Sequence, residues 1–152
     1  MSQNPVTSRE EAVPAQSSVG VRTPSGKGQV VAEYDFSEHG GAIGTIYLAH
    51  DPLPKGAVIT NSYLDVLTAL TSGGAATVAV QAEAAGDIQA AAAVSGAPWS
   101  TTGRKDTTAP EPGTESGYIK TTAIRTLAVV IAAADLTDGR FKAVLEYDVI
   151  GD

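Results

Sequence analysis

The residues best suited to acid–base or metal chemistry are two histidines, each beside a carboxylate. Glu38 precedes His39, and Asp51 follows His50. Metal sites gather His, Cys and carboxylate ligands around one ion, but adjacent residues on a regular strand point to opposite faces. Neither pair can therefore chelate an ion from a strand, and we expect two solvated loop histidines and no metal site. The chain has no cysteine, which excludes disulfides and thiolate zinc sites.

Two glycine-containing motifs match only part of a catalytic or phosphate-binding pattern. His39-Gly40-Gly41 is similar to the oxyanion loop of esterases, but the chain lacks their Gly-x-Ser-x-Gly nucleophile motif. Gly73-Gly74 is not followed by the Lys-Ser or Lys-Thr of a phosphate-binding loop. Spacing alone identifies no glycosidase pair among the 17 Asp and Glu residues. We predict that the chain is not an enzyme and has neither catalytic residues nor a cofactor.

Charge and hydrophobicity argue against two classes of partner. The 152 residues include 10 Lys and Arg against 17 Asp and Glu, a formal net charge of -7. Nucleic-acid binders instead neutralise phosphates with basic side chains. The longest apolar stretches, such as residues 127–134, are far shorter than the roughly 20 residues that span a bilayer. The N-terminus also lacks the basic start and apolar run of a secretory signal. We predict neither a nucleic-acid nor a membrane partner.

Residues 1–28 differ in composition from the rest of the chain. They contain three prolines, many Ser and Thr, and no aromatic residue, so they cannot bury enough apolar surface to offset the entropy of ordering. We expect an extended or disordered N-terminal arm, followed by one domain over residues 29–152. The arm is either a terminus without function or a tether that orders on a partner. The candidate contacts of such a tether are its isolated valines, Val6, Val13, Val19 and Val21.

A long polar segment, residues 95–117, contains three prolines and the single tryptophan, Trp99. Loops of this length are uncommon in compact domains and are usually functional or mobile. Trp99 either folds back to plug one end of the domain or anchors an interface, where tryptophan is enriched at binding hot spots. Arg104 and Lys105 follow it in the same segment. We take Trp99, Arg104 and Lys105 as candidate partner-binding residues.

Short apolar runs separated by Gly, Pro and Asp predict seven or eight strands. This spacing favours an all-β fold, an antiparallel β-sandwich of jelly-roll type. In residues 140–150, alternate positions from Phe141 to Val149 are apolar and define one buried face. The tyrosines within the strands, Tyr34, Tyr47, Tyr63 and Tyr147, are expected in the core or at its edge. The predicted strands cover residues 29–36, 43–49, 58–70, 75–82, 118–122, 125–132 and 140–150.

Three connections carry recognisable local signals. Ser72-Gly73-Gly74 predicts a hairpin between the strands on either side, and Asp138-Gly139 predicts a second hairpin before the last strand. In residues 85–94, Asp87 precedes a run of alanines, the best helix-forming residue. We therefore expect one short helix there and no other.

The middle and end of the chain, residues 43–150, resemble small virion structural proteins of tailed bacteriophages. The similarity consists of a block of strand and turn residues, a Gly-Asp with an alanine-rich turn, and a final strand pair. The matching positions are Leu53, Pro54, Gly56, Val58, Ile59, Asp65, Val66, Thr68, Ser72, Gly73, Gly74, Ala76 and Thr77, then Leu136, Thr137, Gly139 and Phe141.

The resemblance implies a decoration or cement protein that binds the outer surface of a phage capsid and clamps neighbouring copies of the major capsid protein. It also implies a homotrimer, because threefold points repeat over an icosahedral shell. The N-terminal arm could then add a strand to an exposed sheet edge of a neighbour. The alternative is a head-fibre or tail-associated module that recognises a host by binding surface glycan.

Overall fold

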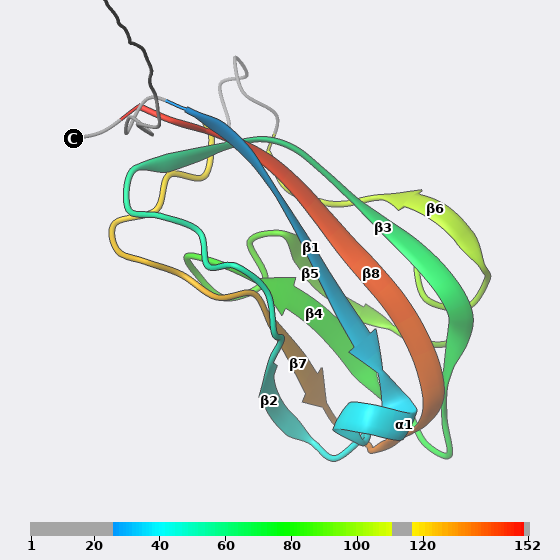
Figure 1. Ribbon diagram of the computed structural model, residues 1–152. Helices are drawn as coiled ribbons and strands as arrows, with labels where there is room; N and C mark the ends of the chain where they lie inside the picture. Colours follow the sequence, from blue (N-terminus) through cyan, green and yellow to red (C-terminus); the bar gives the residue numbers. More distant parts are fainter. Residues whose placement is uncertain (1–25, 111–116, 151–152) are drawn as a thin grey trace, which may run out of the picture.

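The computed structural model describes residues 26–110 and 117–150, which form two four-stranded sheets packed face to face (Figure 1). Sheet A has the strand order β1-β8-β3-β6, and sheet B has the order β2-β7-β4-β5. The elements are β1 (Lys27–Asp35), α1 (Phe36–His39), β2 (Gly44–Tyr47), β3 (Ala57–Ser72), β4 (Thr77–Gln81), β5 (Gln89–Ala93), β6 (Gly103–Asp106), β7 (Ala128–Ala132) and β8 (Leu136–Val149).

All neighbouring strands are antiparallel, and the two sheets are wound together. The pair β1–β8 in sheet A continues along the chain as the pair β2–β7 in sheet B. The pair β3–β6 continues in the same way as β4–β5. This double wrapping is the arrangement of an eight-stranded jelly roll, a fold found in viral capsid proteins, lectins and cupins. The predicted fold class is confirmed.

The core forms because apolar residues alternate along the two longest strands. In β8, Phe141, Ala143 and Leu145 are completely buried, as the pattern predicted. They pair across the sheet with β3, where Leu64 lies opposite Ala143 and Val66 lies opposite Phe141. The side-chain period of two therefore places one face of each strand against sheet B.

The predicted long strand over residues 58–70 is confirmed as β3, which is irregular as expected. Its register against β8 shifts between Ile59 and Asn61 and again between Val66 and Thr68. The predicted strand over residues 118–122 is shorter than expected. It forms an isolated bridge between Lys120 and Val58, beside the start of β3.

Both predicted hairpins are wrong. Ser72-Gly73-Gly74 leads from β3 in sheet A to β4 in sheet B, and Asp138-Gly139 lies inside β8 rather than before it. The signal at Gly139 marks a position that needs glycine geometry. Such a signal does not show whether the chain then pairs with the last strand, crosses to the other sheet or simply continues the same strand. Ser72 stabilises its crossing with a hydroxyl that donates to the carbonyl oxygen of Asp135 at 2.6 Å.

The predicted helix in residues 85–94 is also wrong, because the alanine run forms the edge strand β5. Asp87 does cap backbone groups, but they belong to the turn between β4 and β5. Its carboxylate accepts hydrogen bonds from the amides of Ala82 (2.8 Å), Glu83 (2.9 Å) and Ala84 (2.8 Å). The helix found in the described residues is instead α1, which begins after its N-cap residue, Asp35.

Replacing Asp87 by alanine is expected to lower the free energy of unfolding by about 1–2 kcal/mol, as removal of a capping carboxylate does elsewhere. The variant would leave three turn amides without their acceptor. Urea unfolding followed by circular dichroism measures the change. Asp87→Asn is the matched control: it keeps one acceptor oxygen and should lose less stability than Asp87→Ala. Equal losses in the two variants would contradict the capping role.

The strand tyrosines divide between core and surface. Tyr34 is fully buried, and its hydroxyl donates to the carbonyl oxygen of Gly40 at 2.6 Å. Burial, with the nearby Asp35 carboxylate, raises the pKa of Tyr34 to about 12. Tyr63 and Tyr147 are half-buried. The expectation is wrong for Tyr47, which lies on the edge strand β2 and is 68% exposed.

Candidate functional site

The two histidines hold backbone segments together and are not simply solvated loop residues. The Nε2 atom of His50 accepts a hydrogen bond from the amide of Leu127 at 2.8 Å, and its Nδ1 atom lies 2.6 Å from the carbonyl oxygen of Asp51. The Nδ1 atom of His39 accepts a hydrogen bond from the amide of Asp35 at 3.1 Å. Within residues 26–110 and 117–150, no group of three or more potential ligands is placed to hold a metal ion. In the same ranges, no helix is long and apolar enough to cross a bilayer.

Trp99 is a core residue and not a surface anchor. Its side chain is completely buried, its Nε1 atom donates to the carbonyl oxygen of Val78 at 3.1 Å, and its ring lies 4.8 Å from that of Phe141. The interpretation in which Trp99 folds back to plug the sandwich is therefore correct. Since no part of the indole is accessible in the folded chain, Trp99 offers no surface for the partner contact that was the other interpretation. The four candidate valines, Val6, Val13, Val19 and Val21, lie outside the described residues.

Arg104 and Lys105 lie on β6, an edge strand of sheet A, where a loop was predicted. The Arg104 guanidinium sits 4.1 Å from the centre of the Tyr63 ring, a cation–π contact. The Lys105 ammonium donates to the hydroxyl of Thr101 at 2.6 Å. The structure thus keeps both residues at the surface but gives each a local partner.

The outer face of sheet A carries a row of alternating charges across all four strands. Glu33 lies opposite Lys142, Lys142 opposite Asp65, and Asp65 opposite Arg104. We call this row the charged ladder. Arg140 extends it by contacting Glu33 through its Nε atom. Since opposite charges face one another, the ladder stabilises the sheet and keeps its outer face hydrated. No sequence signal revealed this row, because it depends on the strand order.

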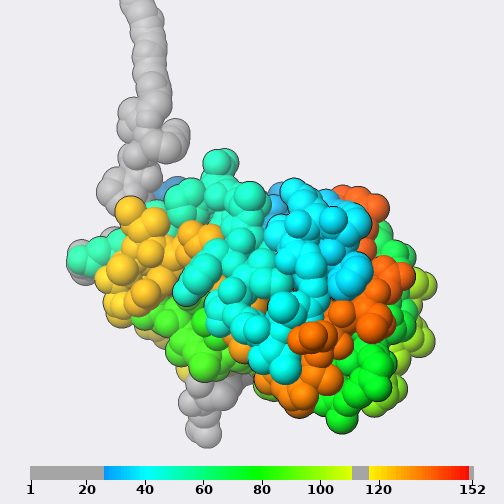
Figure 2. All heavy atoms as spheres, turned by 90° about the horizontal axis from the view of Figure 1, so that it is seen from below, coloured from blue at the N-terminus to red at the C-terminus, as the bar shows by residue number. Residues whose placement is uncertain are grey.

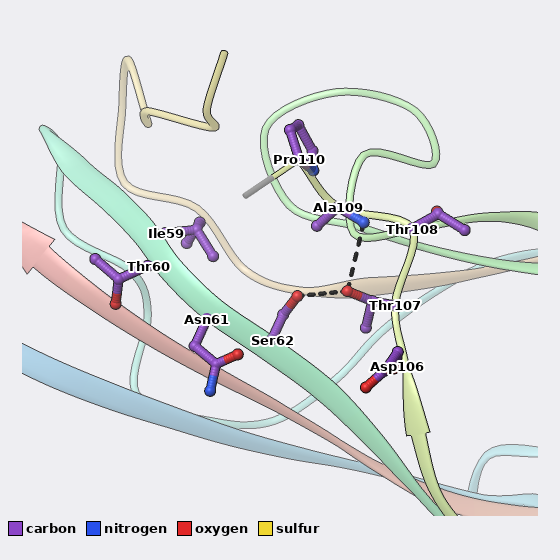
Figure 3. A pocket seen from close by; sticks show the side chains of 9 residues that line it. All are labelled: Ile59, Thr60, Asn61, Ser62, Asp106, Thr107, Thr108, Ala109 and Pro110. Carbon is purple, nitrogen blue, oxygen red and sulfur yellow. Dashed lines mark hydrogen bonds between the residues drawn. The ribbon is translucent and has the colours of Figure 1, made fainter. Parts of the chain in front are cut away.

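A polar hollow of about 670 Å³ lies between the beginning of β3 and the segment after β6. In Figure 3 the hydroxyl of Ser62 points toward that of Thr107, with the two oxygens 2.5 Å apart. Thr60, Asn61 and Asp106 contribute further polar groups to the lining. This arrangement can donate and accept hydrogen bonds but contains neither a nucleophile–base pair nor an oriented acid. No sequence pattern points to this hollow, because its two walls are separated by about forty residues of chain.

One end of the sandwich is closed by an ion pair with two parallel hydrogen bonds. Arg125 donates from Nε to one Glu83 oxygen at 2.8 Å and from a terminal nitrogen to the other at 3.1 Å. The hydroxyl of Thr122 adds a bond of 2.7 Å to the same carboxylate. The Arg125 hydrogen bonds, followed by the Thr122 bond, lower the pKa of Glu83 to about 2. The contact fastens the turn after β4 to the segment before β7.

Glu83→Gln is expected to lower the melting temperature at pH 7 by at most a few degrees, because the pair is partly exposed. The pKa of Glu83 is lower in the folded chain than its ordinary value of 4.5. Its contribution is therefore complete above about pH 4.5 and is lost as the pH falls toward 2. Melting curves from pH 7 to pH 2 should show a constant difference in melting temperature between wild type and variant above about pH 4.5. The difference should disappear as the pH falls toward 2. A difference that persists undiminished at pH 2 would show that the stabilisation does not come from the ionised Glu83 carboxylate.

Comparison with known proteins gives matches in fold alone. No protein-family model and no curated protein matches the chain. A chain of the acid-stable capsid of Helicobacter pylori bacteriophage KHP30 is similar with a TM-score of 0.57 and 14% sequence identity, over 84% of this chain and 90% of that chain. A chain of the capsid asymmetric unit of cyanophage Pam1 is similar with a TM-score of 0.56 and 15% identity, over 89% of this chain and 94% of that chain. The similarity spans nearly the whole length of both neighbours.

Proposed function

We propose that this chain is a structural protein of a bacteriophage virion, and specifically a decoration or cement protein. In this role it binds the outer surface of the capsid and clamps neighbouring subunits of the major capsid protein. The observation that carries the proposal is the end-to-end similarity to chains of two phage capsids. A jelly roll alone is compatible with many functions, so the fold gains weight from the resemblance of residues 43–150 to phage virion proteins.

The architecture suits a clamp. The sandwich places its polar and charged groups on strands of a rigid sheet, as the charged ladder shows. We propose a homotrimer, because three copies joined at a threefold point multiply weak contacts through effective concentration. The N-terminal arm supplies the tether, adding a strand to an exposed sheet edge of a neighbouring capsid subunit. Chemistry at a reacting group has no part in this function.

The test is reconstitution of the shell. Capsids assembled from the major capsid protein of the parent phage are mixed with the purified chain, and the bound copies are counted by quantitative gel densitometry. We expect saturable binding at a fixed ratio and a higher temperature of capsid disruption in a fluorescence melt. Bovine serum albumin at the same concentration is the control. A saturated capsid that melts at the same temperature as a bare one would contradict the clamping role, and absence of binding would contradict the decoration role.

Deletion of residues 1–25 is expected to weaken capsid binding at least tenfold and to leave the melting temperature of the isolated domain unchanged. The truncation point spares β1, whose first residue, Lys27, pairs with Asp148 at 3.1 Å. Isothermal titration with capsids measures the affinity. A full-length variant with all four arm valines changed to serine (Val6, Val13, Val19 and Val21) separates apolar contacts from chain length. Undiminished binding by the truncated chain would assign the arm no role in attachment.

The polar hollow supports a second candidate function, host recognition through surface glycan. Jelly rolls include lectins, and the Ser62 and Thr107 hydroxyls with the Asn61 amide are groups that bond sugar hydroxyls. A glycan array tests this function directly. Binding that is lost in Asn61→Ala would favour it over the decoration role, whereas an array without hits would remove it.

A further inference from the structure

The charged residues of the described fold are divided unequally between the two sheets. The strands of sheet B read Gly-Thr-Ile-Tyr, Thr-Val-Ala-Val-Gln, Gln-Ala-Ala-Ala-Ala and Ala-Val-Val-Ile-Ala, without one charged side chain. Every strand of sheet A carries at least one. In an acidic chain this division is unusual, because a solvated sheet face normally alternates apolar and polar residues.

The outer face of sheet B is formed by small and neutral side chains. Val78, Val80, Val129 and Ile131 point into the core, so the residues between them point outward. Two cross-strand rows bound this surface, which we call the neutral face: Tyr47, Ala128 and Gln81 form one row, and Ala132, Thr77 and Ala93 form the other. Ala128 and the central Ala79 are covered by their neighbours, so the accessible part of the face lies at its rim, with Tyr47, Ala132 and Ala93 exposed.

The two edge strands of sheet B are also neutral, although the amide of Ala90 in β5 already donates to the Thr108 hydroxyl at 2.7 Å. The edge strands β2 and β5 contain neither a charge nor a proline, the devices that usually prevent a sheet from pairing with another chain. The edge strands of sheet A, β1 and β6, carry charges of both signs. Sheet A is therefore built to face water, while sheet B has the properties of a covered surface.

We propose that the neutral face is the contact between copies of this chain. Identical copies each carry a net charge of -7, so they repel one another wherever their charged surfaces meet. Among the described strands, those of sheet B carry no charge, so copies that meet there approach with less repulsion. A partner of opposite charge would instead be recognised through the acidic residues. The inference rests on the homotrimer of the proposed function and names the surface that forms it.

The two edges of the neutral face differ in shape, which fits a contact between the β2 edge of one copy and the β5 edge of the next. Tyr47 is 68% exposed and projects at the β2 edge, whereas the small side chain of Ala93 leaves the β5 edge flat. When the Tyr47 edge of one copy rests on the Ala93 edge of the next, the contact is heterologous, and the proposed trimer requires the rotation between copies to close it into a ring. The tyrosine supplies a large contact area with few rotatable bonds.

The contact extends past the sheet itself. One strand of four residues and three of five cover roughly 300 Å², less than the approximately 800 Å² per partner of a stable interface. Beyond β2, Leu53 pairs with Arg125, and the preceding residue, Ile124, is 69% exposed. Figure 2 shows the segment before β7 (gold) beside β2 and the turns that flank it (cyan). This segment supplies additional area, and its one charged group, Arg125, is already paired with Glu83 of the same chain.

Sedimentation velocity of the full chain tests the proposal. Wild type is expected to sediment as an oligomer at micromolar concentration, and Tyr47→Asp and Ala93→Asp as monomers with unchanged circular dichroism. Leu67→Asp is the matched control: it adds the same charge at an exposed position of sheet A and should remain oligomeric. A monomeric wild type, or an oligomer that survives both sheet B variants, would overturn the proposal.

Salt dependence gives a second, independent readout. Because salt screens the repulsion between like-charged copies, raising it from about 0.05 M to 0.5 M should tighten self-association. A contact made by ion pairs would weaken instead, and that result would overturn the proposal. Capsid binding is measured separately. Oligomers that fail to bind capsids would refute the proposed function and leave this inference standing. Monomers whose capsid binding is lost in Tyr47→Asp would refute the inference and assign the neutral face to the capsid.

Discussion

Replacing Trp99 by alanine is expected to lower the free energy of unfolding by about 3–5 kcal/mol, as removal of a buried aromatic side chain does in other cores. Trp99 joins the two sheets. Its carbonyl oxygen accepts a hydrogen bond from Leu70 in sheet A at 3.0 Å, and its indole donates to Val78 in sheet B at 3.1 Å. The variant would leave a cavity beside Phe141 and remove the indole hydrogen bond to the Val78 carbonyl.

Urea unfolding followed by far-ultraviolet circular dichroism measures this loss, because Trp99 is the single tryptophan and its fluorescence disappears with the substitution. All variants are compared at one protein concentration, since oligomerisation also contributes to apparent stability. Trp99→Phe should retain most of the packing but lose the hydrogen bond to the Val78 carbonyl, at a cost of about 0.5–1.5 kcal/mol. Leu67→Ala, at a position that is 38% exposed, should cost about 1 kcal/mol or less. Equal losses of stability in Trp99→Ala and Leu67→Ala would refute the role of Trp99 as a core residue that joins the two sheets.

Strands were predictable where a single face of the strand is buried. In β8 the apolar residues fall at every second position, and Phe141, Ala143 and Leu145 are all buried. The length of the β3 segment would also suit a helix, but its many β-branched residues correctly indicated a strand. These signals depend on the period of two and not on the neighbouring strands, so the sequence carries them without knowledge of the fold.

The alanine run of β5 shows where local propensity fails. Ala90 to Ala93 favour a helix in isolation, but β5 pairs with β4 and gains the hydrogen bonds of a sheet edge. Asp87 has the capping function that was predicted for it, at a turn and not at a helix. The difference between the two outcomes lies in tertiary contacts with residues about ten positions away, which propensity does not include.

The candidate site was only partly predictable for a related reason. Trp99 stood out because an aromatic residue in a polar, proline-rich segment is unusual, and its two possible roles differ only in which way the side chain turns. The charged ladder joins Glu33 to Arg104 through residues of two other strands. The neutral face likewise joins Tyr47 to Ala93 across four strands. Both surfaces become visible only when the strand order and register are known.

Gly139→Ala is expected to lower the free energy of unfolding by about 3 kcal/mol, because two separate costs meet at this position. Gly139 has a φ of +147°, which side chains with a Cβ rarely adopt. A Cβ there would also lie 2.8 Å from the Cγ atom of Leu70, a core residue that is 2% exposed. The Asp138-Gly139 signal thus identified a genuine backbone requirement, although it marks a bend within β8 and not a hairpin.

Two other glycines separate the two costs. Gly40 has a φ of +77°, but a Cβ added there would meet no atom within 4 Å, so Gly40→Ala tests backbone strain alone and should cost about 1 kcal/mol. Gly73 has neither constraint, and Gly73→Ala should change stability by no more than about 0.5 kcal/mol. Urea unfolding of the three variants should give losses in the order Gly139, Gly40, Gly73. A loss at Gly139 no larger than at Gly40 would show that the core yields to the new methyl group.

A double substitution identifies the residue that resists the methyl group. Leu70→Ala alone should cost about 2–5 kcal/mol through the cavity it creates. In Gly139→Ala combined with Leu70→Ala, the new methyl group enters the space that the leucine vacates, so the double variant should lose less stability than the two single losses added together. The backbone strain at position 139 remains in both backgrounds. The coupling energy therefore measures the steric contact between β8 and β3 alone, and a coupling near zero would mean that strain accounts for the whole effect.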